Sequence, residues 1–202
     1  MADSLAFVQF PHPGGEHRPK GQVRDWNRGL HARKFLKASG EYVLDGELKA
    51  GPLVFWGEWE PQSRVVRTFV NGAPGHPRWL HEPFWEVPRH RRHLQNTDPL
   101  VFGERFLYSN CRQARNRKLR ELAPGSLVVF GSKHQREFVV DTVVVVGDEA
   151  EDFIGASANE VDDDEWVRAV VFDPLRMSPK AAHQQFRLYR GKTYVETPSG
   201  PF

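Results

Sequence analysis

The chain has 202 residues, of which 39% are hydrophobic and 27% charged, and its formal net charge is +2. This length and composition are sufficient for one globular domain with a buried core, and they exclude intrinsic disorder, coiled coils and collagen-like structure. The longest aliphatic run, Val143 to Val146, is far shorter than the ~20 apolar residues of a membrane span. A single cysteine, Cys111, excludes an internal disulfide. We therefore predict a single cytoplasmic domain over residues 1–202 with no membrane partner, and leave its oligomeric state open.

Charge is distributed unevenly along the chain. Residues 1–140 contain 22 Lys and Arg against 14 Asp and Glu, whereas residues 141–202 contain 6 against 12. A basic body with an acidic segment favours a surface that faces a polyanion such as nucleic acid, although a mixed solvated surface explains the same numbers.

The first half of the chain predicts short strands and many turns. A strand over 5–10 stops at a turn rich in proline and glycine, and the polar, basic stretch 16–40 has room for one or two helical turns over 26–36. A strand over 42–44 meets the turn signal Asp45-Gly46. Strands over 52–59 and 63–70 are predicted to pair as a hairpin around 60–62. Residues 71–99 contain five prolines and predict a long irregular loop, a feature that is often functional.

The second half predicts one helix and several strands. The helix is expected over 111–122, with strands over 126–131 and 137–146 and an acidic loop or mobile insert over 148–166. A strand is expected over 167–172, and strands over 186–189 and 193–196 are expected to pair. The chain stops within a turn-like sequence at Phe202, which leaves open whether it continues in a longer protein. Together these elements predict an α+β fold, with a curled antiparallel sheet or small β-barrel, one or two helices and long loops.

Several enzyme motifs are missing from the sequence. There is no phosphate-binding P-loop, no dinucleotide-binding glycine motif, no nucleophile elbow and no Cys-x-x-Cys zinc pair. Four histidines (His76, His81, His90 and His93) lie in the long loop, but their spacing matches no standard metal site. The neighbouring arginines would also repel a cation. We therefore predict no cofactor and no metal, and leave the histidine cluster as an open question.

Two basic clusters are candidate phosphate-binding sites. One is in the long loop and the other on the predicted helix; their candidate residues are Arg89, Arg91, Arg92, Arg112, Arg115 and Arg120. Guanidinium groups at helical spacing can follow a phosphodiester backbone from one side. Tyr108 and Asn110 lie immediately before the helix, where they offer a stacking ring and an amide that can contact a base edge. A solvated helix face is the alternative interpretation.

An aromatic strand provides the candidate ligand-binding residues Trp56, Glu58, Trp59 and Arg64. A tryptophan beside a carboxylate can hold a flat heterocycle, because the ring stacks and the carboxylate accepts hydrogen bonds from amino groups. In the alternative interpretation both tryptophans belong to the core and Arg64 pairs with Glu58 or Glu60.

These residues leave three functional hypotheses open. The leading one is a module that binds nucleic acid or a nucleotide. The first alternative is an enzyme, a hydrolase or glycosidic-bond cleaver, that uses Asp98 and Glu104 with Arg105 on a related substrate. Asp98 before Pro99 is equally explained as a turn cap, and Cys111 as a small buried residue. The second alternative is a protein–protein interaction domain with exposed aromatic residues and a regulatory acidic insert.

Residues 122–131, followed by the apolar segment 137–143, resemble the sheet segment of PUA-like domains, whose branches include ASCH, EVE and YTH domains and bacterial or phage nucleotide-modification families. The resemblance covers about 50 residues, over 95–147. It lacks the Gly-Lys-Lys…Glu motif of the ASCH branch and the aromatic cage of the YTH branch, so no individual binding residue is transferred. It implies a fold whose relatives bind RNA, modified bases or nucleotides in a cleft beside the barrel.

Overall fold

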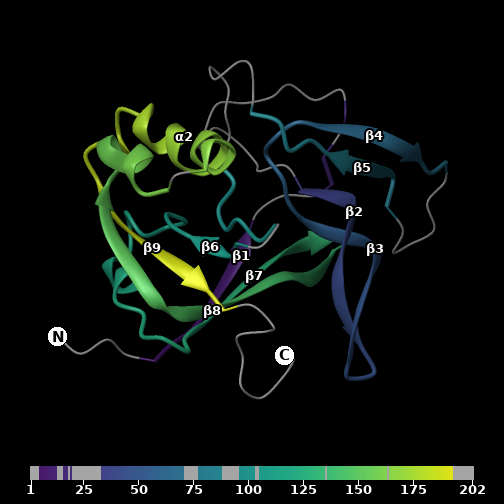
Figure 1. Ribbon diagram of the computed structural model, residues 1–202, viewed down its shortest axis with the longest axis horizontal. Coiled ribbons are helices and arrows are strands. Elements are labelled where there is room, and N and C mark those ends of the chain that lie inside the picture. The colour runs from purple at the N-terminus through teal and green to yellow at the C-terminus, as the bar shows by residue number, and fades with distance from the viewer. Residues whose placement is uncertain are drawn as a thin grey trace.

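The computed structural model describes residues 5–12, 16–17, 19, 33–70, 77–87, 96–102, 105–134, 136–162 and 164–192. These residues form two sheets with a short helical region packed at one corner, so the fold is mixed α and β (Figure 1). The five-stranded sheet has the order β1 (Phe7–His12), β7 (Leu127–His134), β8 (Glu137–Ile154), β9 (Gln185–Gly191), β6 (Leu107–Tyr108). The four-stranded sheet has the order β3 (Glu47–Glu58), β2 (Arg33–Leu44), β5 (Trp79–Pro83), β4 (Ser63–Thr68).

Neither sheet is purely antiparallel, contrary to expectation. In the five-stranded sheet β1 pairs parallel with β7, and in the four-stranded sheet β2 pairs parallel with β5. The parallel pairs join segments far apart in sequence, which local patterns do not reveal. Within the described residues β1 and β6 are the edges of the larger sheet, so this sheet does not close into a barrel.

The β2–β3 hairpin is the longest ribbon among the described residues, with twelve residue pairs. Asp45 and Gly46 form its turn with φ of 55° and 80°, the two positive values that a type I′ turn requires. The turn signal was therefore correct, but the expected pairing of 52–59 with 63–70 was wrong, because β4 pairs with β5. The helical expectation for 26–36 also fails where it can be checked, since β2 begins at Arg33; residues 26–32 lie outside the described part of the chain.

The long loop predicted over 71–99 contains a strand, β5, which occupies the centre of the four-stranded sheet. Residues 71–76 and 88–95 of that segment lie outside the described residues. Since β5 pairs with both β2 and β4, this proline-rich segment completes the sheet.

The predicted helix over 111–122 is also wrong. Its first part forms turns, with Arg112 at a φ of 60°, and only η2 (Arg117–Arg120) is a short 3-10 helix, capped by the Asn116 side chain. Leu119 and Leu122 are nevertheless buried as the apolar anchors that the spacing predicted.

Most described residues of the acidic segment 148–166 lie in strands and helices instead of a loop. Strand β8 extends to Ile154 and is followed by the 3-10 helix η3 (Gly155–Glu160). A continuous helical segment then begins after the Asp164 cap, formed by α1 (Glu165–Val167), the π-helical η4 (Arg168–Phe172) and α2 (Asp173–Arg176). The expected strand 167–172 is therefore helical; its apolar run is equally compatible with a buried helix.

Strand β8 has different partners along its 18 residues. Its first part pairs with β7 and its second part with β9, and the β8–β9 register shifts between Val146 and Ala150. At this bulge a Cβ on Gly147 would lie 2.6 Å from the carbonyl oxygen of Arg190, so the close approach requires glycine. Strand β9 also pairs with β6, whereas residues 193–196, its expected partner, lie outside the described part.

The core consists of two buried clusters. One packs the helical segment against the far part of β8 and β9, and the other lies beneath β1, β7 and β6. No helix among the described residues is long and apolar enough to cross a bilayer.

Candidate functional site

A buried set of polar side chains joins the two sheets. Arg33, at the start of β2, is fully buried, and its guanidinium donates to Glu58 Oε2 of β3 at 2.6 Å. Its Nε lies 3.7 Å from Asp141 Oδ2 of β8 in the other sheet. Nearby, Trp56 Nε1 donates to Ser132 Oγ of β7 at 2.9 Å. Because these contacts cross from one sheet to the other, they fix how the sheets pack.

The Asp141 carboxyl of this junction has a raised pKa. Burial raises its pKa to about 6, against the lowering effect of the Arg33 guanidinium, and the negative charge of Glu58 raises it further. Ser132 Oγ, which accepts from Trp56, donates to Asp141 Oδ2 at 3.3 Å. A buried carboxyl with a raised pKa is typical of functional sites, but this one is also part of an ion-pair network.

Asp98 holds a turn together from inside. Its Oδ1 accepts from the backbone N–H and hydroxyl of Ser109 at 2.6 and 3.1 Å. Its Oδ2 accepts from the backbone N–H groups of Asn110 and Cys111 at 3.0 and 2.5 Å. Burial raises the pKa of Asp98 to about 6 even though three backbone hydrogen bonds lower it. Both oxygens therefore act within the fold, as the turn-cap alternative predicted.

A buried amide pair continues this polar region. Asn110 Nδ2 donates to Asn96 Oδ1 at 2.9 Å, and Asn96 Nδ2 donates to the carbonyl of Val171 in the helical segment at 2.6 Å. Thr97 beside them is fully buried, and its hydroxyl has no hydrogen-bond partner among the described residues. Asn110 is thus a core residue that connects β6 to the helices.

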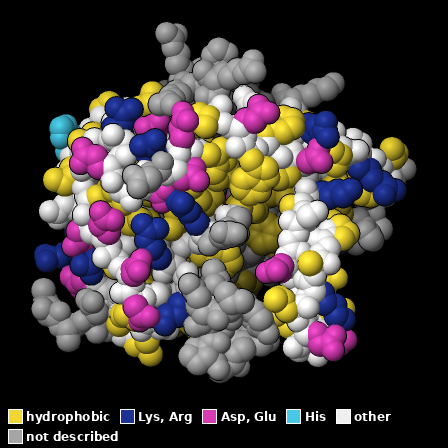
Figure 2. All heavy atoms as spheres, in the orientation of Figure 1, with side chains coloured by type: hydrophobic (Ala, Val, Ile, Leu, Met, Phe, Trp, Pro, Cys, Tyr) yellow, Lys and Arg dark blue, Asp and Glu magenta, His cyan; other side chains and the backbone are white. Residues whose placement is uncertain are grey.

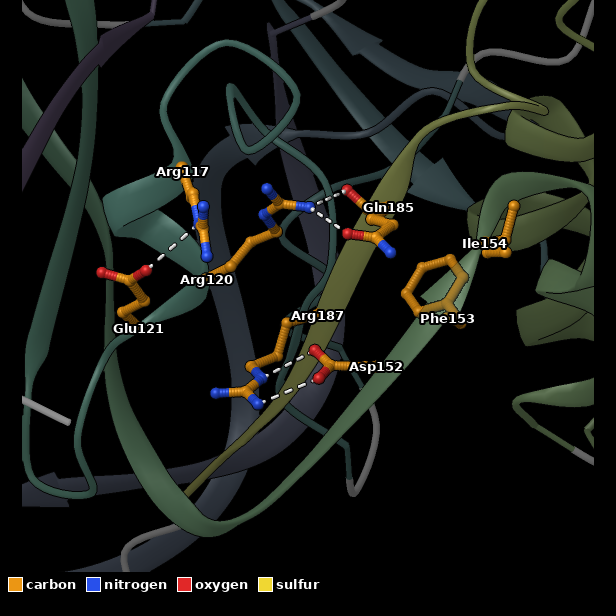
Figure 3. Close-up of a pocket in the computed structure, with 8 residues that line it drawn as sticks. All are labelled: Arg117, Arg120, Glu121, Asp152, Phe153, Ile154, Gln185 and Arg187. Atoms are coloured by element: carbon orange, nitrogen blue, oxygen red, sulfur yellow. Dashed lines mark hydrogen bonds and ion pairs between the residues drawn. The ribbon is translucent and has the colours of Figure 1, made fainter. Parts of the chain in front are cut away.

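An arginine-lined groove of about 620 Å³ lies between η2 and the paired strands β8 and β9 (Figure 3). Arg120 Nη1 donates to the carbonyl and side-chain oxygens of Gln185 at 3.1 and 3.4 Å. Arg187 donates through Nε and Nη2 to Asp152 at 2.8 and 3.0 Å. Arg117 pairs with Glu121 at 3.4 Å, and Phe153 and Ile154 complete the lining. Three guanidinium groups and two carboxylates leave the groove with a net positive charge.

The groove borders a strongly cationic segment. Residues 112–120 contain five basic side chains and no acidic one, and four of the five residues are exposed to solvent: Arg112, Arg115, Arg117 and Lys118. Of these five, Arg117 and Arg120 line the groove, and Arg112, Arg115 and Lys118 are exposed in the same short segment of the chain. This part of the molecule can bind an anion without burying an uncompensated charge.

A second surface feature is an aromatic cluster between the two sheets. Trp59 is fully buried against Trp85, Phe102 and Trp166, with ring centroids 5.2, 4.8 and 5.8 Å away. Trp85 is 47% exposed. Figure 2 shows hydrophobic side chains gathered in a hollow between the helical corner and the four-stranded sheet. The rings already contact each other, and among these four rings Trp85 has the largest exposed surface for a flat ligand to stack on.

The residues of the predicted aromatic site do not form one exposed binding surface. Trp56 and Trp59 are buried, as the core alternative predicted, and Glu58 pairs with buried Arg33. Arg64 is exposed and pairs with Glu82 instead of Glu58 or Glu60. Tyr108 is buried, with its hydroxyl donating to the carbonyl of Cys111 at 2.9 Å.

The predicted cationic residues are divided between the groove and its surroundings. Arg120 lines the groove, and Arg112 and Arg115 are exposed on the neighbouring turn. Arg105 pairs with buried Asp162 at 2.5 Å. Of the four histidines only His81 is described, and it is buried. The remaining predicted residues, Arg89, Arg91, Arg92, Glu104, His76, His90 and His93, lie outside the described residues.

Arg117 and Arg187 are site residues that the sequence analysis missed. Arg117 belongs to the same cationic run as Arg115, so its charge alone could have included it. Arg187 reaches the groove because β9 pairs with β8, with Asp152 opposite Arg187 in the register. No sequence signal indicates that pairing. Within the described part of the chain no group of three or more His, Cys, Asp and Glu side chains is placed to hold a metal.

Comparison with known proteins adds no relative: no family model, curated protein or solved structure matches this chain.

Proposed function

We propose that the protein binds nucleic acid or a nucleotide, with phosphate groups held at the arginine-lined groove and the cationic turn beside it. The observation that carries the proposal is a groove lined by Arg117, Arg120 and Arg187, with exposed Arg112, Arg115 and Lys118 in the same short segment of the chain as Arg117 and Arg120. Phosphate contacts dominate the affinity of nucleic-acid-binding proteins, and arginine is well suited to them because its planar fork matches two phosphate oxygens.

The partners of the three arginines support different roles in this proposal. Arg120 contacts the neutral oxygens of Gln185, so a phosphate would meet a cation that those contacts leave uncompensated. Arg117 and Arg187 are paired with Glu121 and Asp152. Exposed pairs of this kind contribute little free energy. A phosphate can therefore replace one carboxylate at small cost, and Arg120 is the expected centre of the site.

We propose Trp85, instead of Trp56 or Trp59, as the ring on which a base stacks. Trp56 and Trp59 are buried, whereas Trp85 of the aromatic cluster exposes about half of its surface. A base stacked on an exposed aromatic ring typically contributes ~1–3 kcal/mol. A relationship to PUA-like domains, including recognition of a modified base, is the finer form of this proposal and is supported by the sequence resemblance over 95–147.

The test is a fluorescence-anisotropy titration of labelled single-stranded and double-stranded DNA and RNA at ~50 and ~200 mM salt. We expect at least one of the four to bind, with an affinity that falls steeply at the higher salt concentration. Failure of all four to bind would overturn the nucleic-acid proposal, and free nucleotides would then be the remaining ligands. Binding that does not change with salt would favour the protein-interaction alternative, in which the exposed rings make the contacts.

Paired variants locate the phosphate contacts. The double variants R117A/R120A and R112A/R115A should each lower the magnitude of the salt slope by about 1.5, the value for two lost phosphate contacts. R64A is the control. Arg64 is also an exposed arginine paired with a glutamate, but it and its partner Glu82 belong to the four-stranded sheet, whereas the groove lies beside the five-stranded sheet. Equal affinities and slopes for all three variants would exclude the groove and its cationic turn as the binding surface.

The enzyme alternative gains no support from Asp98, whose two oxygens accept four hydrogen bonds from residues 109–111 in the interior. A general acid or base must reach the substrate, and this carboxyl is buried.

A further inference from the structure

Three polar side chains on adjacent strands of the four-stranded sheet share one face. Leu36 of β2 and Val65 of β4 are both register partners of His81 of β5. Lys34 and Ser63 each precede these neighbours by two residues, and side chains two positions apart on a strand point to the same side. The sheet therefore brings an amine, a hydroxyl and an imidazole together from three separate segments of the chain.

Their contacts form a chain of hydrogen bonds. Lys34 Nζ donates to Ser63 Oγ at 3.0 Å and to the carbonyl of Pro61 at 3.3 Å. Ser63 Oγ lies 3.2 Å from His81 Nδ1. Ser63 is half-buried, while Lys34 and His81 are buried. A hydroxyl within hydrogen-bond distance of a base, with the base held in turn by a third group, is the arrangement of an activated nucleophile.

Burial shifts both bases toward their neutral forms. Desolvation lowers the pKa of Lys34 to about 8, although the nearby Glu60 carboxylate raises it. Desolvation, together with the charges of Lys34 and His17, lowers the pKa of His81 to about 4. His81 Nε2 is buried without a hydrogen-bond partner among the described residues. Lys34, His81, His17 and Glu60 are therefore the titratable groups that set the protonation of this site.

We propose that Ser63 is a nucleophile for acyl transfer, activated by Lys34, with His81 as the second hydrogen-bond partner of its hydroxyl, and that the substrate class is a carboxylic ester. Ser63 Oγ would form a bond to the carbonyl carbon while its proton passes to the neutral Lys34 amine. The bond to the alcohol oxygen then breaks, and the alcohol leaves with that proton. Water, deprotonated by Lys34, attacks the acyl-serine, giving a carboxylic acid and regenerating Ser63.

This inference does not depend on the proposed nucleic-acid function. The groove lies beside β8 and β9 of the five-stranded sheet, whereas Lys34, Ser63 and His81 belong to the other sheet. Loss of nucleic-acid binding in R117A/R120A should leave Ser63 reactivity unchanged, so failure of one proposal is distinguishable from failure of the other.

The test treats the full chain with an alkyl fluorophosphonate, in which Ser63 Oγ would bond to phosphorus, fluoride would leave and the proton would pass to Lys34. Mass spectrometry of the digested protein then measures the rate of adduct formation at each serine. We expect Ser63 to react about 100-fold or more faster than Ser178, since a positioned base typically contributes that much. Ser178 is a matched internal control, because it is also half-buried but its Oγ accepts from the N–H of Ala181. Equal rates at the two serines would overturn the proposal.

Two variants separate a base from a structural lysine. K34R keeps a cation that can donate to Ser63, but it cannot accept a proton at neutral pH. A folded K34R, verified by its thermal unfolding, should therefore lose the fast labelling of Ser63, and S63A should lose the adduct entirely. In the unmodified protein the rate should rise with pH through about 8, where the Lys34 amine becomes neutral. A K34R protein that still labels at the original rate, with the same pH profile, would also overturn the proposal.

Discussion

Burial favours the neutral forms of different groups in the two halves of the molecule. In the half built on the five-stranded sheet these groups are the carboxyls of Asp98 and Asp141, whereas in the four-stranded sheet they are the bases Lys34 and His81, and the buried carboxylate of Glu58 there pairs with Arg33. In each case burial is the largest cause of the pKa shift: it raises the pKa of both carboxyls to about 6 and lowers those of Lys34 and His81 to about 8 and 4. For Asp98, Asp141 and Lys34 desolvation thus outweighs the hydrogen bonds and charges that favour the ionised forms, and for His81 the charges of Lys34 and His17 act in the same direction as desolvation.

This difference has opposite consequences for stability in acid. A carboxyl whose pKa is raised on folding binds its proton more readily in the folded protein, so stability increases as the pH falls from about 7 to 4. A histidine whose pKa is lowered binds its proton more readily in the unfolded chain, so stability decreases over the same range. Between pH 7 and 4 the stability gained by the carboxyls of one half therefore offsets the stability lost through the histidine of the other. The two halves are joined at the buried contacts of Arg33 with Glu58 and Asp141.

Replacing the shared cation should have the largest effect. The variant R33M leaves Glu58 and Asp141 in the interior without their cation, and breaking a buried ion pair by removing one partner typically costs ~3–5 kcal/mol. Denaturant unfolding measures the loss. R64M is the control, since the exposed Arg64–Glu82 pair should contribute at most about 1 kcal/mol. A loss in R33M no larger than that in R64M would show that Arg33 does not hold the two halves together.

Removing the carboxyl of Asp98 tests the five-stranded half alone. D98A leaves the backbone N–H groups of residues 109–111 without their acceptor, and unsatisfied buried donors cost about 1–3 kcal/mol. We expect reduced stability in denaturant unfolding, together with faster amide hydrogen exchange confined to residues 109–111. Unchanged exchange at those amides would contradict a stabilising role for their hydrogen bonds to the Asp98 carboxyl.

A single substitution in each half should reveal its separate contribution to the pH dependence of stability. Relative to the unmodified protein, H81F should gain stability as the pH falls from 7 to 4, because it lacks the histidine whose protonation favours unfolding. D141N should lose stability over the same range, because it lacks the carboxyl whose protonation favours folding. Both changes should be on the order of 1–2 kcal/mol and are measured by thermal unfolding across pH. Shifts of the same sign would contradict the opposite character of the two halves.

An effect of similar size is expected at the turn that closes the β2–β3 hairpin of the four-stranded sheet. G46A places an L side chain at a φ of 80° and should cost about 1–2 kcal/mol, although no atom lies within 4 Å of the added Cβ. G51A is the matched control in the same hairpin, where the added Cβ would be in ordinary contact with Tyr42 at 3.7 Å. Equal melting temperatures for the two variants would show that the turn conformation does not limit stability.

Local signals predicted the parts of the fold that depend on neighbouring residues. The Asp45-Gly46 dipeptide predicted its turn because few residues adopt two successive positive φ angles. The apolar runs 126–131 and 137–146 predicted strands that are present within β7 and β8. Residues 167–172 misled the analysis because a short buried apolar run suits a strand and a helix equally.

The candidate sites were less predictable because their residues come together through strand pairing. Arg120 could be proposed from the cationic run, but Arg187 joins it only through the β8–β9 register. Likewise, the contact of Ser63 with Lys34 requires the insertion of β5 between β2 and β4, and that strand lies in a segment whose prolines predicted a loop. Non-local pairing is the information that the sequence pattern lacks.

The bulge in β8 also determines where the chain can change length. At residues 147–149 the ladder with β9 is already interrupted, so one added or deleted residue there would alter a segment that is not in regular register. The same change between residues 142 and 145, where β8 is in regular register with β7, would turn every following side chain of the paired strand to the opposite face. Length variation among homologous chains should therefore be tolerated at residues 147–149 and excluded from residues 142–145.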